Sequence, residues 1–484
     1  MINYVDGVCG SGKTSEAIKR IAKRVKGGET IIYATSTTDL LKQTMEGLEA
    51  NGVEVELIIS KSDSGYRQDL VSDRLKNRIC IEKDNPRVIL CVTKSLIKVA
   101  SRLLSDVKLP LFLDEGFEAI DYGTESQMTG TEIQAVLYNV GLSDEKPKDY
   151  KIGNNYKLSE GLKRLSDYTR NPLYEVEFKV NESQLQWTSM LIISGFFQCF
   201  SEVTILSACF DDTLEYHAAK AVGIEMKALD WGLETKHYSN GVVHVSWVLS
   251  GKEWRTSFKD KLTERQLNDI ADEFWREHCG DYLSVNGVGE GSINLPVKSH
   301  GINEYSSICN YLNLHTQMPP NFVVDLIKKR FSLTKFQIRK SYYHYHCYQS
   351  AMRTVLRKSS KDNPIEKDTY YCFGDKSTAM YFLGKLSNSV KVSCCQLQIG
   401  ERLDVIRLKP RSDKISLDFK EQDKRRRDRA KLQKWGCKDV LLEKVLIIAR
   451  DWRRAHTGKN LTLKILKGLV DSVSNCGDLN LGSA

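Results

Sequence analysis

The sequence predicts an α/β protein with two successive parallel-sheet domains and a small basic α-helical domain at the C-terminal end. Short apolar runs rich in β-branched residues alternate with segments of helical periodicity through most of the chain, and this alternation is typical of parallel sheets covered by helices. The 484 residues suffice for several domains, each with its own core. We expect the boundaries at 1–245, 246–400 and 401–484.

The composition is that of an ordinary globular protein, with 41% hydrophobic and 27% charged residues. No apolar run approaches the roughly 20 residues that a membrane span needs, and the first expected strand starts at residue 2, which leaves no room for a signal peptide. The 13 cysteines are scattered and odd in number. They favour reduced thiols in a cytoplasmic or nuclear compartment over a disulfide framework or a zinc finger.

The net charge is concentrated in the C-terminal region. Residues 401–484 carry 21 Lys and Arg against 12 Asp and Glu, which accounts for the whole net charge of +9. A basic domain appended to a neutral body indicates a polyanionic partner, most often nucleic acid. The apolar spacing predicts helices over 439–450 and 461–470, which suit nucleic acid or a replication or packaging protein; a solubilising tail is the alternative.

A glycine-rich loop near the N-terminus carries the most specific pattern. Residues 7–14, Gly-Val-Cys-Gly-Ser-Gly-Lys-Thr, match Gly-x4-Gly-Lys-Ser/Thr between an expected strand at 2–5 and an expected helix at 16–25. Glycines let backbone N–H groups point at a phosphate, and the helix N-terminus adds its dipole. The sequence therefore predicts that ATP and Mg²⁺ bind here, with Lys13 on the β- and γ-phosphates and Thr14 on the metal. The contacting residues are expected to be Gly7, Cys9, Gly10, Ser11, Gly12, Lys13 and Thr14.

An apolar strand at 109–113 delivers two adjacent acids, Asp114 and Glu115. Ligands of open α/β sheets bind at the carboxyl edge where such a strand ends. We expect Asp114 to hold the Mg²⁺ and Glu115 to orient and deprotonate the water that attacks the γ-phosphate. The alternative, for the Asp114–Glu115 pair taken alone, is that it only caps the next helix.

Hydroxyl residues follow two further expected strands, at 29–34 and 87–92. Thr35 and Ser36 end the first of them, and Thr93 ends the second. Hydroxyl and N–H groups at these positions can contact a phosphodiester backbone, although a helix N-cap is an equally simple use. Between the strands, residues 60–85 give no clear pattern.

The stretch from 120 to 197 is less legible. A helix is expected to begin near Glu132, and a short strand within 176–185. A buried strand follows at 203–206 and ends in Ser207, Ala208 and Cys209.

These motifs, taken in order, resemble motifs I, II and III of superfamily 2 helicases. Thr35–Ser36 and Thr93 stand where that family has motifs Ia and Ib. The resemblance implies two RecA-like domains with ATP between them. It also implies that Ser207-Ala208-Cys209, with Cys in place of the family's Thr, couples hydrolysis to domain movement. The gap between Asp114 and Ser207 is long for the family and predicts an insertion within about 120–195.

The second half continues the resemblance. The expected helix at 264–278 and strand at 281–286 resemble the start of the second domain. Residues 297–305 resemble motif V, which implies that Gly301 and Asn303 contact the nucleotide or the nucleic acid. Residues 348–357 resemble motif VI, with Gln349, Arg353 and Arg357 expected on one helix face. Such an arginine neutralises the γ-phosphate when the cleft closes, and both Arg353 and Arg357 are candidates.

The aromatic run at 342–347 is expected to form a packed strand that leads into this helix. His344 and His346 would then share one side, but no second pair of ligands accompanies them, so the pattern does not favour a metal site.

The sequence thus predicts an ATP-dependent helicase or translocase, with DNA somewhat favoured over RNA. One alternative is a terminase-type packaging ATPase, in which a nuclease with clustered acids replaces the second RecA-like domain. Another is an ATP-dependent switch or scaffold that does not unwind nucleic acid.

Overall fold

The computed structural model has one compact unit over Met1–Val405. The expected helices at 439–450 and 461–470, and the motif V residues Gly301 and Asn303, lie outside the residues that the structure describes. Those residues are 1–59, 71–81, 85–100, 108–126, 128–143, 159–181, 184–278, 280–285, 289, 292–296 and 305–405.

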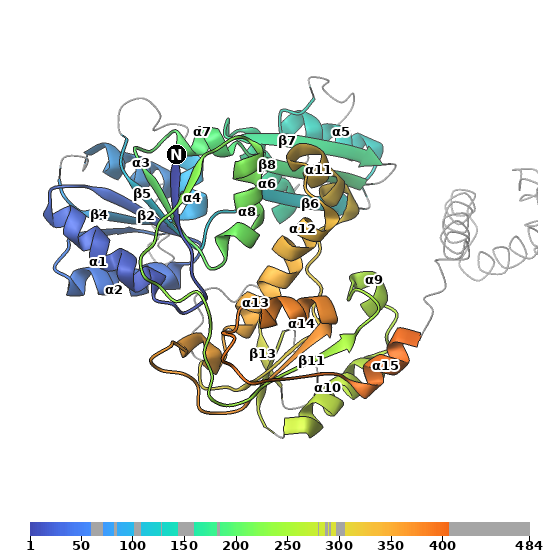
Figure 1. The fold of residues 1–484 in the computed structure, drawn as a ribbon. Coiled ribbons are helices and arrows are strands. Elements are labelled where there is room, and N and C mark those ends of the chain that lie inside the picture. The colour runs from blue at the N-terminus through green and yellow to red at the C-terminus, as the bar shows by residue number, and fades with distance from the viewer. Residues whose placement is uncertain are drawn as a thin grey trace, which may run out of the picture. The chain divides into compact units, whose positions relative to one another are not determined.

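The first half is built on a seven-stranded sheet whose strands all run parallel (Figure 1). The strand that precedes the glycine loop, β1, and the strand that carries the acidic pair, β5, are separated by one strand, β9. This order brings the three predicted motifs to one edge of the sheet. In spatial order the strands are β10 (Met226–Ala228), β1 (Ile2–Val5), β9 (Val203–Leu206), β5 (Leu111–Asp114), β2 (Ile31–Thr35), β4 (Val88–Val92) and β3 (Val55–Ile58).

Helices cover both faces of this sheet because successive strand residues point to opposite sides. In β2, Ile31 and Tyr33 pack against one set of helices, while Ile32 and Ala34 pack into a separate core on the other face. The first face is covered by α1 (Lys13–Lys26) and α2 (Thr38–Ala50). The second is covered by α3 (Val71–Ile81), α4 (Thr93–Ala100), α7 (Ile193–Phe197) and α8 (Leu214–Ala221). The stretch 60–85, which gave no clear pattern in sequence, therefore contains α3.

The predicted insertion is an antiparallel sheet of three strands with its own small core. It has the order β6-β8-β7 and packs against two helices around Trp187 and Leu165. The strand expected within 176–185 is present but longer than expected, because β7 already begins at Tyr174. It pairs with a second eight-residue strand, β8, that the sequence did not predict. The elements are β6 (Ile120–Ser126), α5 (Gly130–Asn139), α6 (Glu160–Thr169), β7 (Tyr174–Asn181) and β8 (Gln184–Leu191).

The second half is built on a six-stranded sheet, again with all strands parallel. In spatial order the strands are β13 (Ser292–Leu295), β12 (Tyr282–Val285), β14 (Asn310–Asn313), β15 (Thr369–Asp375), β11 (Val243–Leu249) and β16 (Val392–Gln396). Its own helices include α9 (Thr256–Lys259), α10 (Glu264–His278), α14 (Lys376–Leu383) and α15 (Gln398–Val405). The two parallel sheets confirm the predicted fold class. Because β11 begins at Val243, the sheets divide within 229–242 and not at the expected 245.

Two helices that follow β14 in sequence pack on the first half. They are α11 (Asn321–Phe331) and α12 (Lys335–Arg339), and their residues Val323, Ile327 and Ile338 belong to the same core as the first sheet. Arg330 also donates to Glu177 of β7 at 2.7 Å, and Figure 1 shows α11 beside the antiparallel sheet that contains β7. The second half is therefore interleaved with the first.

The strand expected at 342–347 is also wrong. Helix α12 continues into a π-helical turn, η2 (Lys340–His344), and then into α13 (Tyr345–Ala351). The aromatic residues that favour strands are buried here on several sides of a helix, so the usual amphipathic period is missing. Within the described residues, no helix combines the length and the apolar character needed to cross a bilayer.

Candidate active site

The glycine loop joins β1 to the N-terminus of α1. Gly10 and Gly12 have φ values of 79° and 87°, in the left-handed region that glycine adopts without a steric penalty. The Lys13 Nζ donates to the carbonyl oxygens of Val8 at 2.8 Å and Gly7 at 3.2 Å. The N–H of Gly7 donates to Asp6 at 2.8 Å. These bonds hold the loop curled around the start of α1, as a phosphate site requires.

Asp114 lies beside this loop and is only 3% exposed. One of its carboxylate oxygens accepts hydrogen bonds from the hydroxyls of Thr14, at 2.7 Å, and Tyr33, at 2.5 Å. Burial, and after it the charge of Glu115, raises the pKa of Asp114 to about 6. A buried carboxylate next to a hydroxyl offers the hard oxygen ligands that Mg²⁺ prefers. The pair Thr14–Asp114 therefore fits the metal that the sequence predicts.

Glu115 follows Asp114 in an unusual backbone conformation. Its φ is 65°, and that of Cys209, at the end of the neighbouring strand β9, is 49°. Non-glycine residues with positive φ are uncommon, and strain of this kind gathers at functional sites. The Glu115 N–H donates to Leu206 at 2.9 Å, and the Cys209 N–H donates to Gly7 at 3.3 Å. Both turns are thereby fixed next to the loop.

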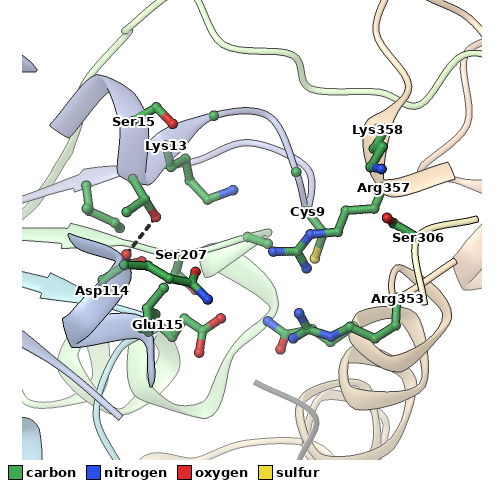
Figure 2. Close-up of a pocket in the computed structure, with 18 of the residues that line it drawn as sticks. Cys9, Lys13, Ser15, Asp114, Glu115, Ser207, Ser306, Arg353, Arg357 and Lys358 are labelled. Atoms are coloured by element: carbon green, nitrogen blue, oxygen red, sulfur yellow. Dashed lines mark hydrogen bonds between the residues drawn. The ribbon is translucent and has the colours of Figure 1, made fainter. Parts of the chain in front are cut away.

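A cavity of about 550 Å³ opens over the loop, a volume within the usual range for small-molecule sites. Figure 2 shows Lys13, Asp114 and Glu115 on one side of it, and Arg353 and Arg357 on the other. Of the predicted residues, those that line the cavity are Cys9, Gly10, Gly12, Lys13, Thr14, Asp114, Glu115, Ser207, Ala208, Gln349, Arg353 and Arg357.

The sequence predicts Gln349 and the two arginines on one continuous helix, and this expectation is wrong. Helix α13 ends at Ala351, and Arg357 lies on a separate 3₁₀ turn, η3 (Val355–Lys358). At the helix end, the Ala351 carbonyl accepts from the Thr354 hydroxyl at 2.7 Å and from the Thr354 N–H at 3.2 Å, so a carbonyl left over there is satisfied without a further helical turn. The bend still directs both arginines into the cavity (Figure 2).

Arg353 is almost fully buried, at 2% exposure. Burial, and after it the charge of Arg357, lowers its pKa to about 10. The side chain therefore stays charged near neutral pH. Among the charges that favour the cation is that of Glu115, so the arginine and the expected catalytic base act on each other within the cavity.

Tyrosines on α13 hold the two halves together at the loop. The N–H of Cys9 donates to the Tyr348 hydroxyl at 3.0 Å, and that hydroxyl is 2.9 Å from Nε2 of His237. The Ser207 and Tyr345 hydroxyls are 3.3 Å apart. The Gln349 amide donates to the Tyr345 hydroxyl at 2.5 Å.

Our sequence reasoning missed these tyrosines, together with Tyr33 and His237. Tyr345 and Gln349 are four positions apart, so they share a face of a helix. A helical assignment of 342–347 would have found Tyr345, whereas the assignment as a strand concealed it. The partner of Tyr348 is His237, more than 100 positions earlier in the chain, and no local pattern points to it.

The residues expected to contact nucleic acid lie outside the cavity lining. Thr35 is fully buried and Thr93 is 4% exposed, so neither hydroxyl reaches the surface. Ser36 is exposed and donates to the Glu115 carboxylate at 3.3 Å. Gly7, Ser11 and Cys209 also lie outside the lining. Gly7 still supports the loop as acceptor for Lys13 and Cys209, and the Ser11 N–H donates to Val8 at 3.2 Å.

No protein-family model matches the chain, and no curated protein matches it in sequence. Several solved structures are similar to it. Xpd4 of S. tokodaii is 10% identical, with 81% of this chain and 96% of that chain covered and a TM-score of 0.42. S. cerevisiae Dbp5 bound to RNA and ADP BeF3 is 11% identical over 83% and 89%, with a TM-score of 0.35. The arterivirus nonstructural protein 10 (helicase) in complex with DNA is 9% identical over 79% and 63%, with a TM-score of 0.26.

In fold, the chain is similar to these solved structures. Two parallel sheets, with a phosphate loop on the first and arginines presented by the second, are the arrangement that the motif order implied. At these identities and TM-scores the likeness concerns the fold alone. The site therefore rests on the geometry of this chain.

Proposed function

We propose that the protein is an ATP-dependent nucleic-acid helicase or translocase that hydrolyses ATP between its two halves. One observation carries the proposal. Lys13, Asp114 and Glu115 of the first half and Arg353 and Arg357 of the second line the same cavity, although more than 200 residues separate the two groups in sequence.

Each residue has a defined task in this proposal. The loop N–H groups and Lys13 bind the phosphates, and Thr14 with Asp114 holds the metal. Mg²⁺, when bound, would neutralise charge between the β- and γ-phosphates. Glu115 orients the attacking water and accepts its proton. Arg353 faces Glu115 across the cavity and neutralises the charge that develops on the γ-phosphate.

The basic region 401–484 and the exposed Ser36 support a nucleic-acid partner, for which we propose DNA somewhat over RNA. Ser36 also bonds to Glu115, so a strand contacting Ser36 would act directly on the catalytic base. The ten cysteines in the described residues are free thiols, in keeping with the reducing, cytoplasmic or nuclear compartment that we propose.

A terminase-type packaging ATPase is the competing proposal. It needs a nuclease site of clustered metal ligands, and the described part of the chain contains no group of three or more His, Cys, Asp or Glu side chains that could hold a metal. The parallel second sheet and its arginines favour the helicase. Metal-dependent cleavage of plasmid DNA by the purified protein would reverse this preference.

The decisive experiment measures ATP hydrolysis with single- and double-stranded DNA and RNA, and then strand displacement on the best stimulator. We expect nucleic acid to raise the turnover rate. Lys13→Ala should abolish hydrolysis, and Glu115→Gln should keep nucleotide binding while stalling turnover. Lys19→Ala, on the exposed side of α1, is the matched control and should behave like the wild type.

Two results would count against the proposal. Wild-type turnover in Lys13→Ala would show that ATP is not hydrolysed at the glycine loop. Hydrolysis that ignores every nucleic acid tested would favour the ATP-dependent switch or scaffold instead.

A further inference from the structure

A buried carboxylate outside the cavity joins the first half to the second. Asp212 ends a short 3₁₀ helix, η1 (Phe210–Asp212), three residues after Cys209, and is 2% exposed. Its carboxylate accepts from Tyr381 at 2.6 Å and from Lys385 at 2.9 Å, and it forms an ion pair with Lys340. All three partners belong to the second half.

The charges around Asp212 favour its ionised form. Burial by itself would raise the pKa of Asp212, but Lys340, Lys385 and Tyr381 more than offset this and lower it. The adjacent Asp211 differs, because it is exposed and burial of part of its carboxyl, followed by the charge of Asp212, raises its pKa. Of these two neighbouring acids, only Asp212 is therefore enclosed by cations.

The partners of Asp212 include the helix that leads to the arginines. On the segment formed by α12, η2 and α13, the Ser341 hydroxyl donates to the Asp212 carbonyl at 2.9 Å. Tyr345 contacts Ser207, and Tyr348 contacts Cys9. Positions 341, 345 and 348 are spaced by four and three residues and so share one helix face. This face is attached to the first half at three points, and Asp212 provides one of them.

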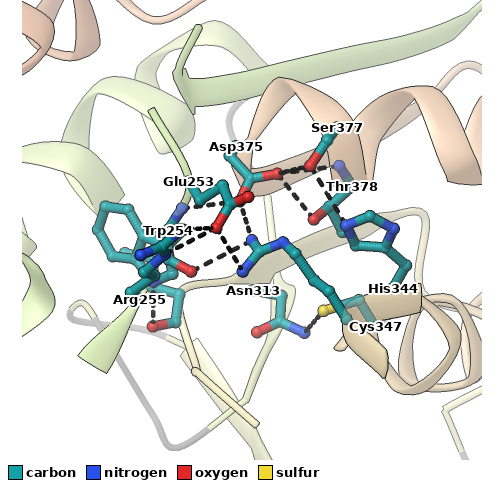
Figure 3. Close-up of polar contacts among 11 residues, drawn as sticks. Glu253, Trp254, Arg255, Asn313, His344, Cys347, Asp375, Ser377 and Thr378 are labelled. Atoms are coloured by element: carbon teal, nitrogen blue, oxygen red, sulfur yellow. Dashed lines mark hydrogen bonds and ion pairs between the residues drawn. The ribbon is translucent and has the colours of Figure 1, made fainter. Parts of the chain in front are cut away.

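Arg339, the residue before Lys340, is bound to the second half and not to the first. Arg339 is buried and forms an ion pair with Asp375 at the end of β15. Figure 3 shows Asp375 beside Trp254 and Ser377. Asp375 also accepts from the N–H of Trp254 at 2.8 Å and the hydroxyl of Ser377 at 2.7 Å. Arg339 is thus bound to the second sheet, while Lys340 is bound to Asp212 of the first half.

The π-helical turn begins at this junction and spans Lys340–His344. Such turns insert one extra residue into a helix and are frequent at functional sites. The turn here starts where Arg339, bound to the second sheet, is followed by Lys340, bound to the first half. It also sets the rotation of α13, and with it the direction of Gln349 and of the arginines beyond the helix end.

We propose that Asp212 is a positioning residue for ATP hydrolysis, holding the α12–η2–α13 segment so that Gln349 and Arg353 face the phosphates. The inference rests on the proposed ATPase function. Asp212 is not among the residues that line the cavity, so it acts through Lys340, Lys385 and the helix and not on the nucleotide. Breaking the pair frees the helix to rotate, while the phosphate loop of the first half stays intact.

The test compares Asp212→Asn with Asp211→Asn as the matched control. Asparagine keeps an acceptor for Tyr381 and removes the charge. We expect kcat for ATP to fall about 10- to 100-fold in Asp212→Asn. The KM and the Kd of a fluorescent ATP analogue should change less than about 3-fold, because the loop that binds nucleotide is untouched. Asp211→Asn should keep wild-type values, and Asp212→Glu should recover part of the lost rate.

Lys385→Met supplies a second variant in case Asp212→Asn does not fold. In Lys385→Met the Asp212 carboxylate is still neutralised by Lys340. This variant should lower kcat in the same way, and the double variant should be no slower than Asp212→Asn alone because both changes break one contact. An unchanged kcat in the folded variants would overturn the proposal, as would a parallel rise in Kd. Absence of ATP hydrolysis in the wild type would instead remove the proposed function itself.

Discussion

The backbone N–H of Cys9, inside the phosphate loop, donates a 3.0 Å hydrogen bond to the hydroxyl of Tyr348, 339 positions later in the chain. The same hydroxyl lies 2.9 Å from Nε2 of the buried His237. Burial, helped by nearby cations and opposed by a backbone hydrogen bond, lowers the pKa of His237 to about 3, so the ring is neutral near pH 7. Three uncharged groups therefore form a chain of hydrogen bonds: the Cys9 N–H of the loop, the Tyr348 hydroxyl of the second half, and the His237 ring of the segment between the two sheets.

Tyr348→Phe should remove this connection. We expect the free energy of unfolding to fall by about 1–3 kcal/mol, because the buried N–H of Cys9 loses its acceptor. ATP turnover should also fall, since the loop is no longer attached to α13. Chemical denaturation and steady-state hydrolysis measure the two effects. In the control Tyr168→Phe, a tyrosine loses its 2.7 Å bond to Asp121 far from the loop in sequence, and only stability should change. Equal losses of turnover in both variants would contradict the prediction.

Asp114→Asn should stabilise the protein at neutral pH in the absence of Mg²⁺. The folded-state pKa of Asp114 is about 6, above the value of about 4 expected in the unfolded chain. The folded state therefore binds the proton more tightly, and the carboxylate destabilises the fold progressively as pH rises from about 4 to 6. Above that range the cost is roughly 2–3 kcal/mol, and an amide avoids it while still accepting from Thr14 and Tyr33.

Unfolding measured at pH 4.5 and at pH 7.5 tests this. The stability gained by Asp114→Asn should be largest at pH 7.5 and small at pH 4.5. Asp362→Asn, which changes an exposed carboxylate, should give no such pH-dependent difference. A gain that does not grow between the two pH values would show that the carboxyl of Asp114 carries no raised pKa.

Gly10→Ala and Gly12→Ala form a matched pair within the loop. Both residues have positive φ, so each alanine costs roughly 1–2 kcal/mol of backbone strain. A Cβ on Gly10 would also overlap the carbonyl oxygen of Arg357, whereas a Cβ on Gly12 would meet no atom within 4 Å. Without nucleotide, Gly10→Ala should therefore be less stable than Gly12→Ala by about 1–3 kcal/mol. Equal melting temperatures would mean that the loop and η3 do not pack closely in solution.

The two arginines should separate kinetically. Arg353 is buried, and its charge interacts with that of Glu115, whereas the backbone of Arg357 packs on Gly10. Arg353→Lys should lower kcat about 100-fold or more with little change in KM, as expected for a contact made in the transition state. Arg357→Lys should mainly raise KM. Arg255→Lys, on a half-exposed side chain, is the control. Identical changes in both parameters for the two variants would argue against separate roles.

The sequence by itself determined what depends on short segments. The phosphate loop, the acidic pair after β5 and the alternation of strands and helices are set by residues close together in the chain, and their geometry follows from glycine, strand ends and helix N-termini. The long gap between Asp114 and Ser207 likewise predicted the insertion, because a break in the expected spacing is visible without knowledge of its fold.

Only the tertiary structure decided how the second half meets the loop. Residues 342–347 look like a strand by local preference, but they form part of a helix with a π-helical turn. That helix contacts the first half through Ser341 on Asp212, Tyr345 on Ser207 and Tyr348 on Cys9. Helix α13 ends at Ala351, whose carbonyl accepts from both the hydroxyl and the N–H of Thr354, and Arg353 and Arg357 lie beyond that end. The contacts of Ser341, Tyr345 and Tyr348 with the first half join residues more than 100 positions apart, and such contacts leave no period or spacing in the sequence.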